Sequence, residues 1–430
     1  MKRLFLFVMI FILVFAITSS SVSSQGKTTT LTFWTFQQLH KEFMDDAVAT
    51  WNVANPNKQI QLKSSVYKDD EMANKLLIAL QAGVGAPDIA DVNINVFPNY
   101  LKGTTVSLVP LNDIVEPVLN KVVKSRLDNY FKDGNYYGIP THVGATVMYY
   151  NTEIMDKAGV NIDDIVTWKD YVEAGKKVVA KTGKPMTTVE VLGNWTFQPL
   201  ISQRGSDIFD KNGKVILDNE TNINVLQEIV DWVYKDKIAI PAPGGLHGSE
   251  EYWGFMNKGG AASVMMPMWF MGRFVNYMPD LKGKIAIRPL PRWTEGGNRS
   301  AGMGGTGTVI TIQCKNQELA KEFLSAAKLS REGSIKIWTK LGFDPVRWDV
   351  WDAPEMSEPN EFTDYFVNGT EIFNVLLKVK DEINQVNITE NYTAAIDLIK
   401  SVVAFKALKE RSLTPEEVLK QVADELRAME

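Results

Sequence analysis

The chain has 430 residues and a formal net charge of −5, with 51 acidic and 46 basic side chains. This acidic balance, without basic clusters, argues against nucleic acid or an anionic membrane surface as a partner. The single cysteine, Cys314, excludes an internal disulfide and a site with several cysteine ligands.

The N-terminal segment predicts export. Lys2 and Arg3 precede an apolar run over residues 4–17, and small residues follow over 18–24. This order is typical of a secretory signal peptide, residues 1–24, and the apolar run is shorter than the ~20 residues that span a membrane. We expect cleavage after Ser24, with an uncleaved membrane anchor as the alternative. The roughly 400 residues that remain predict two domains.

Strands and helices alternate at the start of the mature chain. The predicted elements are strands over 31–36, 60–64 and 88–92 and helices over 39–51 and 71–82. This β-α-β-α-β succession predicts an α/β fold whose parallel sheet is covered on both faces by helices. Ligands of such sheets bind beyond the carboxyl ends of the strands, which here are residues 34–38 and 93–97.

Residues 136–159 predict a crossing between two domains. Gly138 and Pro140 interrupt regular structure before a β run over 143–150 and a short helix over 151–159. A segment rich in breakers that feeds a strand far from either terminus is typical of such a crossing. It predicts a two-lobed receptor whose function belongs in the cleft.

The second half of the chain is more helical. We expect helices over 168–181, 222–235, 250–257 and 317–329, strands over 261–265, 284–287 and 308–312, and a helix after Thr414. Thr167 with Asp170, and Thr414 with Glu417, have the spacing of helix N-terminal caps. Prolines and acids over 352–361 indicate a linker.

The motifs of enzymes are absent or stand in the wrong context. Residues 302–307 read G-x-G-x-x-G, but a β-branched run follows where a dinucleotide site needs a helix, so a cleft-edge or hinge loop is favoured. His40, His142 and His247 have no zinc-site spacing, and no G-x-S-x-G is present. We expect no catalytic residue, no metal and no cofactor.

Individual histidines and acids leave alternatives open. His40 and His247 are expected at the solvated surface or in loops. For His142 a polar ligand contact and a structural hydrogen bond stay open. Carboxylate pairs such as Asp69–Asp70 are expected in solvated turns, and sequence cannot place an acid pair at the separation that glycoside hydrolysis requires.

Tryptophan gives the strongest compositional signal, with 11 residues. Aromatic rings lie against the C–H faces of sugars, while planar polar side chains bond the hydroxyls. We expect three or four of the loop tryptophans to face a ligand. The candidates are Trp34, Trp195, Trp253, Trp269, Trp293, Trp338, Trp348 and Trp351.

Short motifs in a fixed order connect these features. They are LTFWTF at 31–36, GVGAPDI at 83–89, YGIP at 137–140, MYYN at 148–151, TW at 167–168, MNKGGAA at 256–262, PLP at 289–291 and AKEFL at 320–324. In this order the mature chain resembles the family 1 extracellular solute-binding proteins of ABC importers, the maltose-binding-protein type.

The resemblance implies two α/β lobes with parallel or mixed sheets, a hinge and an interlobe cleft. Its implied boundaries are residues 25–140 and 311–352 for lobe 1, 146–305 and 360–430 for lobe 2, and 141–145, 306–310 and about 353–359 for the crossings. It further implies a saccharide ligand, ABC permease subunits as partners, no nucleic acid, and a monomer.

The resemblance also implies contact residues in the cleft, motif by motif. They are Trp34, Phe36, Gln37, Asn93, Asn95, Thr141, His142, Trp195, Trp269, Gly304, Gly305, Asp344 and Arg347. Many relatives carry a lipobox cysteine that this chain lacks, which favours a periplasmic protein of a double-membraned bacterium.

Two other functions stay open at this point. One is a secreted glycoside hydrolase that uses an acid pair in the same cleft. The other is the same fold with a non-sugar solute, although few basic residues at the cleft edge argue against an anionic one. Within the sugar hypothesis, we expect a plant-derived pentose or hexose oligomer.

Overall fold

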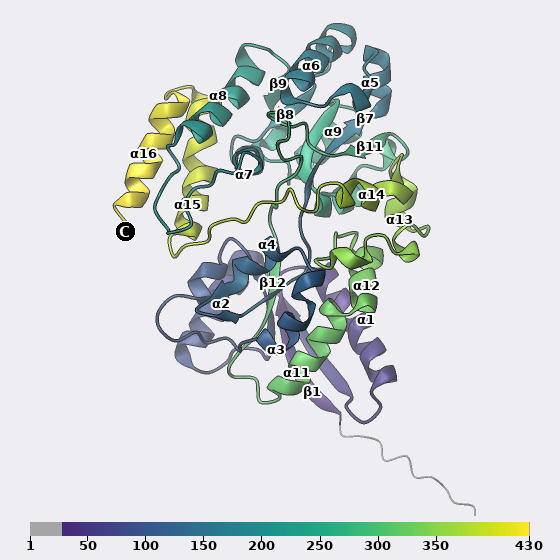
Figure 1. Ribbon diagram of the computed structural model, residues 1–430, viewed down its shortest axis with the longest axis vertical. Helices are drawn as coiled ribbons and strands as arrows, with labels where there is room; N and C mark the ends of the chain where they lie inside the picture. The colour runs from purple at the N-terminus through teal and green to yellow at the C-terminus, as the bar shows by residue number, and fades with distance from the viewer. Residues whose placement is uncertain (1–27, 430) are drawn as a thin grey trace, which may run out of the picture.

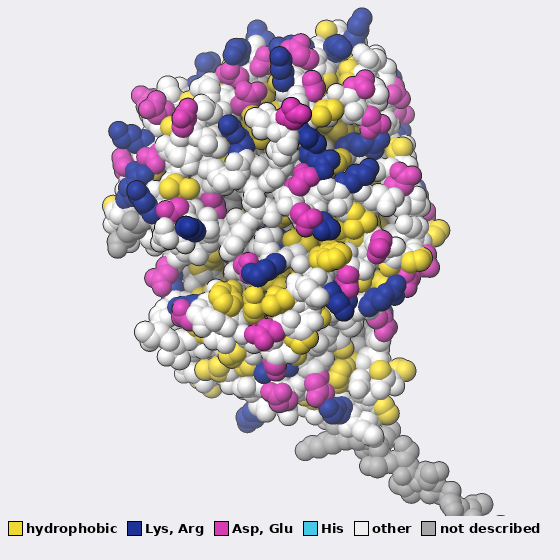
Figure 2. Space-filling view, viewed as in Figure 1, with side chains coloured by type: hydrophobic (Ala, Val, Ile, Leu, Met, Phe, Trp, Pro, Cys, Tyr) yellow, Lys and Arg dark blue, Asp and Glu magenta, His cyan; other side chains and the backbone are white. Residues whose placement is uncertain are grey.

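The computed structural model describes residues 28–429, so the predicted signal peptide lies outside the described residues. The chain forms two lobes, and its path passes between them several times (Figure 1). None of the helices in residues 28–429 is long and apolar enough to span a membrane. On the face in Figure 2, acidic and basic side chains are interspersed, and apolar side chains gather near the middle, where the lobes meet.

The core of lobe 1 is a five-stranded sheet in the order β2-β1-β3-β12-β6. Its strands are β1 (Thr29–Thr35), β2 (Ile60–Val66), β3 (Ile89–Asn93), β6 (Ile139–Pro140) and β12 (Thr306–Ile310). As predicted, β1 runs parallel to β2 and β3. The sheet as a whole is mixed rather than parallel, because β12 enters from lobe 2 and pairs antiparallel with β3 and β6.

Helices cover both faces of this sheet. They are α1 (Gln38–Ala54), α2 (Asp69–Ala82), α3 (Asn112–Val115), α4 (Lys124–Leu127), α11 (Gln317–Leu324) and α12 (Arg331–Leu341), with the small hairpin β4 (Phe131–Lys132) and β5 (Asn135–Tyr136) beside them. Of the apolar residues that predicted α1, Phe43, Ala47 and Trp51 are buried, whereas Leu39 at the start of the helix is exposed. The α2 helix ends at Gly83 in the left-handed conformation, as predicted.

Lobe 2 is built around the antiparallel order β10-β7-β11. Its strands are β7 (Thr146–Asn151), β8 (Thr187–Val189), β9 (Ala239–Pro241), β10 (Ser263–Pro267) and β11 (Ile285–Arg288). Its helices are α5 (Thr152–Ala158), α6 (Trp168–Thr182), α7 (Phe197–Gln203), α8 (Glu220–Tyr234), α9 (Glu250–Asn257), α10 (Met271–Tyr277), α13 (Glu361–Tyr365), α14 (Ile372–Leu377), α15 (Tyr392–Leu398) and α16 (Pro415–Arg427).

Both predicted helix caps are present. Thr167 and Asp170 exchange side-chain and backbone hydrogen bonds at the start of α6, and Thr414 and Glu417 do the same at the start of α16. Each cap satisfies N–H groups that an uncapped helix start leaves without a partner. These two helix starts follow from local sequence alone.

The crossings meet in the middle of the molecule. Residues 141–145 lead from β6 in one sheet to β7 in the other. The predicted crossing at 306–310 is corrected: these residues are β12, inside the lobe 1 sheet, and the glycine-rich loop before them makes the passage. That loop bridges back to the first crossing through Ala145 and Gly302. As predicted, the glycine motif leads into a strand and not into a helix.

Candidate functional site

The carboxyl end of β1 carries a group of half-buried aromatic residues. The Trp34 ring lies edge-on to Tyr67, with 5.3 Å between ring centroids, and the Lys75 ammonium lies 5.6 Å from the centroid of Trp34. Phe36 lies edge-on to His40 at 6.0 Å. Strand β1 ends here, beside β2 and β3, so lobe 1 presents aromatic surface where the fold places ligands.

Polar side chains stand at the end of the neighbouring strand β3. The side-chain amide of Asn93 donates to Asp69 Oδ2 at 2.8 Å, and its Oδ1 accepts from the backbone N–H of Asn95 at 3.0 Å. The Asn95 carbonyl accepts from Thr393 Oγ1 of α15 at 2.8 Å, a direct contact between the lobes. Gln37, two residues after β1, is exposed.

Lobe 2 contributes a pair of half-buried tryptophans. The rings of Trp195 and Trp269 are 4.9 Å apart at an interplanar angle of 71°. The Trp269 indole N–H donates to the Met303 carbonyl at 3.2 Å, and the Trp195 backbone N–H donates to Glu190 Oε2 at 2.9 Å. The tryptophan pair is thus attached to the loop before β12 on one side and to a buried carboxyl on the other.

That loop contacts both lobes. Gly304 has φ 66°, and a Cβ there would lie 3.2 Å from the Trp269 indole nitrogen, so only glycine fits without displacing the ring. The next residue, Gly305, accepts from the Ile94 N–H at 3.0 Å, directly after β3. The predicted residues Gly304 and Gly305 therefore place Trp269 next to the carboxyl end of β3.

Two acids with raised pKa values lie on the two sides of this junction. Burial raises the pKa of Glu190 to about 7, although N–H groups of His247 and Trp195 donate to it and Lys400 lies near. Burial also raises the pKa of Asp69, against its hydrogen bond from Asn93 and the charge of Lys400. Lys400 thus lies within electrostatic reach of both lobes.

Three predicted contact residues are used inside the protein and do not join this group. The Thr141 hydroxyl accepts from Lys328 Nζ at 2.7 Å. Asp344 is fully buried and accepts from the backbone N–H groups of Gly144 and Ala145. The Arg347 guanidinium donates to Asp349 and to the Leu329 carbonyl. The expectation that Thr141, Asp344 and Arg347 contact a ligand is therefore corrected: all three are internal structural residues, and Thr141 and Asp344 act at the first crossing.

The three histidines are buried, which corrects the expectation for two of them. His40 Nδ1 lies 3.0 Å from Asp91 Oδ2, and His247 Nε2 lies 2.9 Å from Thr188 Oγ1. His142 packs 4.8 Å from the Phe343 ring, and within residues 28–429 neither of its ring nitrogens has a hydrogen-bond partner. Burial holds the pKa of His142 well below its usual value, so its ring is neutral.

Four residues near the junction were not predicted: Tyr67, Asp69, Glu190 and Lys400. Asp69 was expected in a solvated turn, but it lies just past the carboxyl end of β2 and is half-buried against Asn93. The rule that selected Trp34 and Asn93 applies to β2 as well and could have selected Tyr67 and Asp69. Nothing in the local sequence marks Glu190 or Lys400. Of the other loop tryptophans, Trp338 and Trp351 are core residues.

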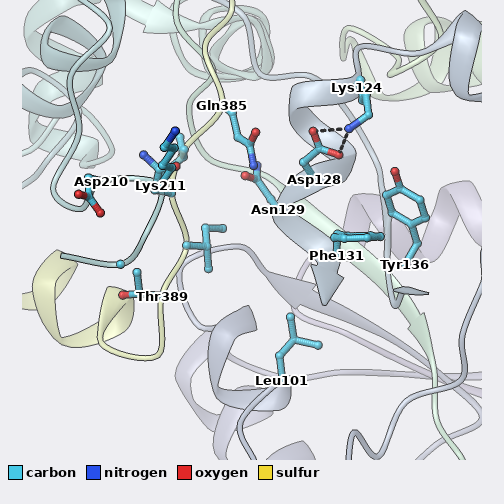
Figure 3. A pocket seen from close by; sticks show the side chains of 14 residues that line it. Leu101, Lys124, Asp128, Asn129, Phe131, Tyr136, Asp210, Lys211, Gln385 and Thr389 are labelled. Atoms are coloured by element: carbon cyan, nitrogen blue, oxygen red, sulfur yellow. Dashed lines mark hydrogen bonds and ion pairs between the residues drawn. The ribbon is translucent and has the colours of Figure 1, made fainter. Parts of the chain in front are cut away.

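A separate groove of about 480 Å³ lies between the lobes near α4. Lys124 and Asp128 form an ion pair on its lobe 1 side, next to Phe131, and segments 210–213 and 385–389 close it from lobe 2 (Figure 3). None of the contact residues predicted from sequence lines this groove. Within residues 28–429 no group of three or more His, Cys, Asp or Glu side chains could hold a metal ion.

Comparison with known proteins identifies the family of this chain. Residues 36–330 match the family model described as bacterial extracellular solute-binding protein. An arabinooligosaccharide-binding protein of Bacillus subtilis is 55% identical over 410 residues, which cover 95% of this chain and 94% of that protein. A protein of the same name from Halalkalibacterium halodurans is 52% identical over 400 residues, 93% of this chain and 89% of its own.

Solved structures agree in fold. The GacH receptor of Streptomyces glaucescens has a TM-score of 0.74 at 19% identity, covering 94% of this chain and 98% of its own. Maltose-bound MalE3 of T. maritima has a TM-score of 0.73 at 21% identity, covering 94% and 100%. These two-lobed neighbours confirm the predicted fold class. The family match and the relatives at more than half identity show that this chain belongs to the bacterial extracellular solute-binding proteins.

Proposed function

We propose that the protein is an extracytoplasmic receptor that captures an oligosaccharide between its lobes and delivers it to the permease of an ABC importer. One observation carries the proposal: each lobe carries half-buried aromatic side chains, Trp34 and Phe36 at the end of β1 and Trp195 and Trp269 in lobe 2, and the loop that holds Trp269 also bonds to Ile94 directly after β3. Rings of this kind suit the C–H faces of sugars. Asn93 and Asn95 beside them supply groups for hydroxyls.

The first ligand class to test is an oligomer of arabinose. Two relatives at 52% and 55% identity bear the name arabinooligosaccharide-binding protein. The matches cover 95% and 93% of this chain. This choice agrees with the plant-derived oligomer expected from the sequence.

Capture requires that the sugar bind the closed arrangement of the lobes better than the open one. The Thr393–Asn95 hydrogen bond joins the lobes at the edge of the proposed site. A sugar that contacts Trp34 of lobe 1 and Trp269 of lobe 2 stabilises the closed arrangement in the same way, because it makes both contacts only when the lobes are closed. Binding alone supplies the free energy, and no covalent step is needed.

The geometry gives no support to glycoside hydrolysis. A hydrolase needs one carboxyl free to donate a proton and a second free to act on the sugar or on water. Both oxygens of Glu190 already accept from backbone N–H groups, and Asp69 accepts from the Asn93 amide. The acids nearest the aromatic groups therefore hold the site together.

The decisive experiment is calorimetric titration of the mature protein with arabinooligosaccharides, with maltooligosaccharides and glucose as controls. We expect saturable binding of the arabinose oligomers, and a stabilisation of about 2.7 kcal/mol at a hundredfold excess over Kd. Chromatography after incubation should recover the sugar unchanged. New reducing ends at catalytic rates, or binding of none of the sugars, would reject the proposal.

The place of action is part of the proposal. We infer that the mature protein diffuses freely outside the cytoplasm, in a periplasm, as a monomer. N-terminal sequencing of protein recovered from cell fractions tests this: a mature start at Gln25 in the soluble fraction supports it. Retention of residues 4–17 in the membrane fraction would favour the anchored alternative.

A further inference from the structure

The aromatic surface of lobe 2 continues beyond the tryptophan pair. Trp269 lies just before α10, and Arg273 and Tyr277 follow at intervals of four residues. Residues four apart lie on the same face of a helix, so these three side chains form one stripe. With a rise of 1.5 Å per residue, the stripe extends roughly 12 Å from Trp269, which is longer than a single sugar ring.

The outer end of the stripe is a stacked aromatic pair. The rings of Tyr277 and Trp253 are 4.2 Å apart at an interplanar angle of 10°, and Tyr277 remains 46% exposed. The Arg273 guanidinium lies 5.4 Å from the Trp253 ring centroid and 5.9 Å from that of Tyr277. The Trp253 indole N–H donates to the His247 carbonyl at 3.0 Å, which fixes the ring.

A second path of contacts connects this pair to the proposed site. Gly248 follows His247, and a Cβ at Gly248 would lie 3.4 Å from the Trp195 ring. Trp195 contacts Trp269, so the turn at 247–248 and the helix α10 connect the same two aromatic pairs. Packing contacts therefore run from the Trp195–Trp269 pair to Trp253 and Tyr277.

We propose that Tyr277, Trp253 and Arg273 form an outer subsite for the far end of an oligosaccharide whose near end lies on Trp195 and Trp269. The aromatic pair offers a face for sugar C–H groups, and the guanidinium offers fixed donors for neutral hydroxyls. Continuity with the site where the sugar is proposed to bind selects this occupant. The inference rests on the proposed function and adds a chain-length preference to it.

The test compares a short and a long ligand. Calorimetry would measure arabinobiose and arabinohexaose on the wild type, on Tyr277→Ala and on Arg273→Gln. The matched control is Phe131→Ala, because Phe131 is an exposed aromatic residue (44%) of the other groove. We expect Tyr277→Ala to weaken arabinohexaose binding at least tenfold and arabinobiose binding less than twofold, with Arg273→Gln intermediate and the control unchanged.

Several outcomes would overturn the inference. Equal losses for both ligands would indicate a general disturbance of lobe 2, which the melting temperature of each variant checks. Unchanged affinities of the variants for both arabinobiose and arabinohexaose would reject the outer subsite. Unchanged affinities with a lower stimulation of the reconstituted importer's ATPase would assign the surface to the membrane partner. If the wild type binds neither sugar, the proposed function itself fails, whereas binding of both with equal affinity rejects only the outer subsite.

Discussion

Asp344 accepts a hydrogen bond of 2.8 Å from the backbone N–H of Ala145, although the two residues are 199 positions apart in the chain. Its other oxygen accepts from the Gly144 N–H at 3.1 Å. Ala145 ends the first crossing, and Asp344 follows α12, so one fully buried carboxyl ties the first crossing to the segment after α12. The residue that the family pattern suggested as a sugar contact instead stabilises the crossings.

We expect Asp344→Ala to destabilise the protein because two buried N–H groups lose their acceptor. Each unsatisfied buried group costs about 1–3 kcal/mol. Urea unfolding at pH 6 measures the loss, and the exposed Asp352, changed to Ala, is the control. An unchanged unfolding midpoint for Asp344→Ala would contradict the assigned role.

The stability of the protein should decrease as the pH rises from about 4 to about 7. Burial raises the pKa of Glu190, Asp207 and Asp344 to about 7 each, above the ordinary values near 4. In this window the folded state binds more protons than the unfolded state, so the unfolding free energy falls with rising pH and levels off above about pH 7. Thermal unfolding followed by circular dichroism from pH 4 to pH 8 measures it.

Asp91 determines how the stability falls again at low pH. Burial alone would raise the pKa of Asp91, but the Lys328 charge and its hydrogen-bond donors lower it to about 2. The contribution of Asp91 to the unfolding free energy is present above pH 4 and is lost as the pH falls toward 2. We therefore expect maximal stability near pH 4–5. Glu190→Gln should flatten the decline above that maximum. A melting temperature that rises from pH 5 to pH 8 is the contrary result.

Removing one ring from either lobe should weaken sugar binding. Trp34→Ala and Trp269→Ala each remove a ring from one side of the proposed site, and we expect each to raise Kd for an arabinose oligomer at least tenfold. Trp348→Ala is the control, because that tryptophan is not among the proposed contact residues and its ring lies 4.9 Å from the Lys380 ammonium. Calorimetry measures Kd for each variant. If only one of Trp34→Ala and Trp269→Ala raises Kd, the sugar is not held between the lobes.

Local signals predicted much of this structure, and long-range pairing decided the rest. The β1 and β3 strands and the caps at Thr167 and Thr414 follow from periodicity and capping residues nearby in sequence. Residues 306–310 were misassigned because β12 pairs with β3, more than 200 residues away. The same distinction between local signals and long-range contacts applies to the residues of the site. Trp34 and Asn93 lie at the carboxyl ends of strands that the sequence predicts, whereas the burial of Asp344 and Glu190 depends on partners that no local pattern reveals.

The last prediction concerns a buried ion pair below the sheet of lobe 1. Lys328 Nζ lies 3.9 Å from Asp91 Oδ1, and both side chains are about 2% exposed or less. Lys328→Met removes the lysine charge from beside Asp91 and leaves the carboxylate with His40, Thr35 and Thr308. Removing one partner of a buried ion pair costs about 3–5 kcal/mol. Lys58→Met breaks a pair with Glu322 of 2.7 Å whose side chains are 56% and 46% exposed, and it should cost less than about 1 kcal/mol.

Chemical unfolding at pH 7 separates these two cases, and a double variant tests the cause. If the loss in Lys328→Met comes from the uncompensated charge, adding Asp91→Asn should recover part of the stability, because a neutral amide then replaces the buried carboxylate. A double variant no more stable than Lys328→Met would show instead that the loss comes from the hydrogen bonds of Lys328 to Thr141 at the first crossing and to Thr308 of β12. In that case the lysine, like Asp344, acts on the passage between the lobes.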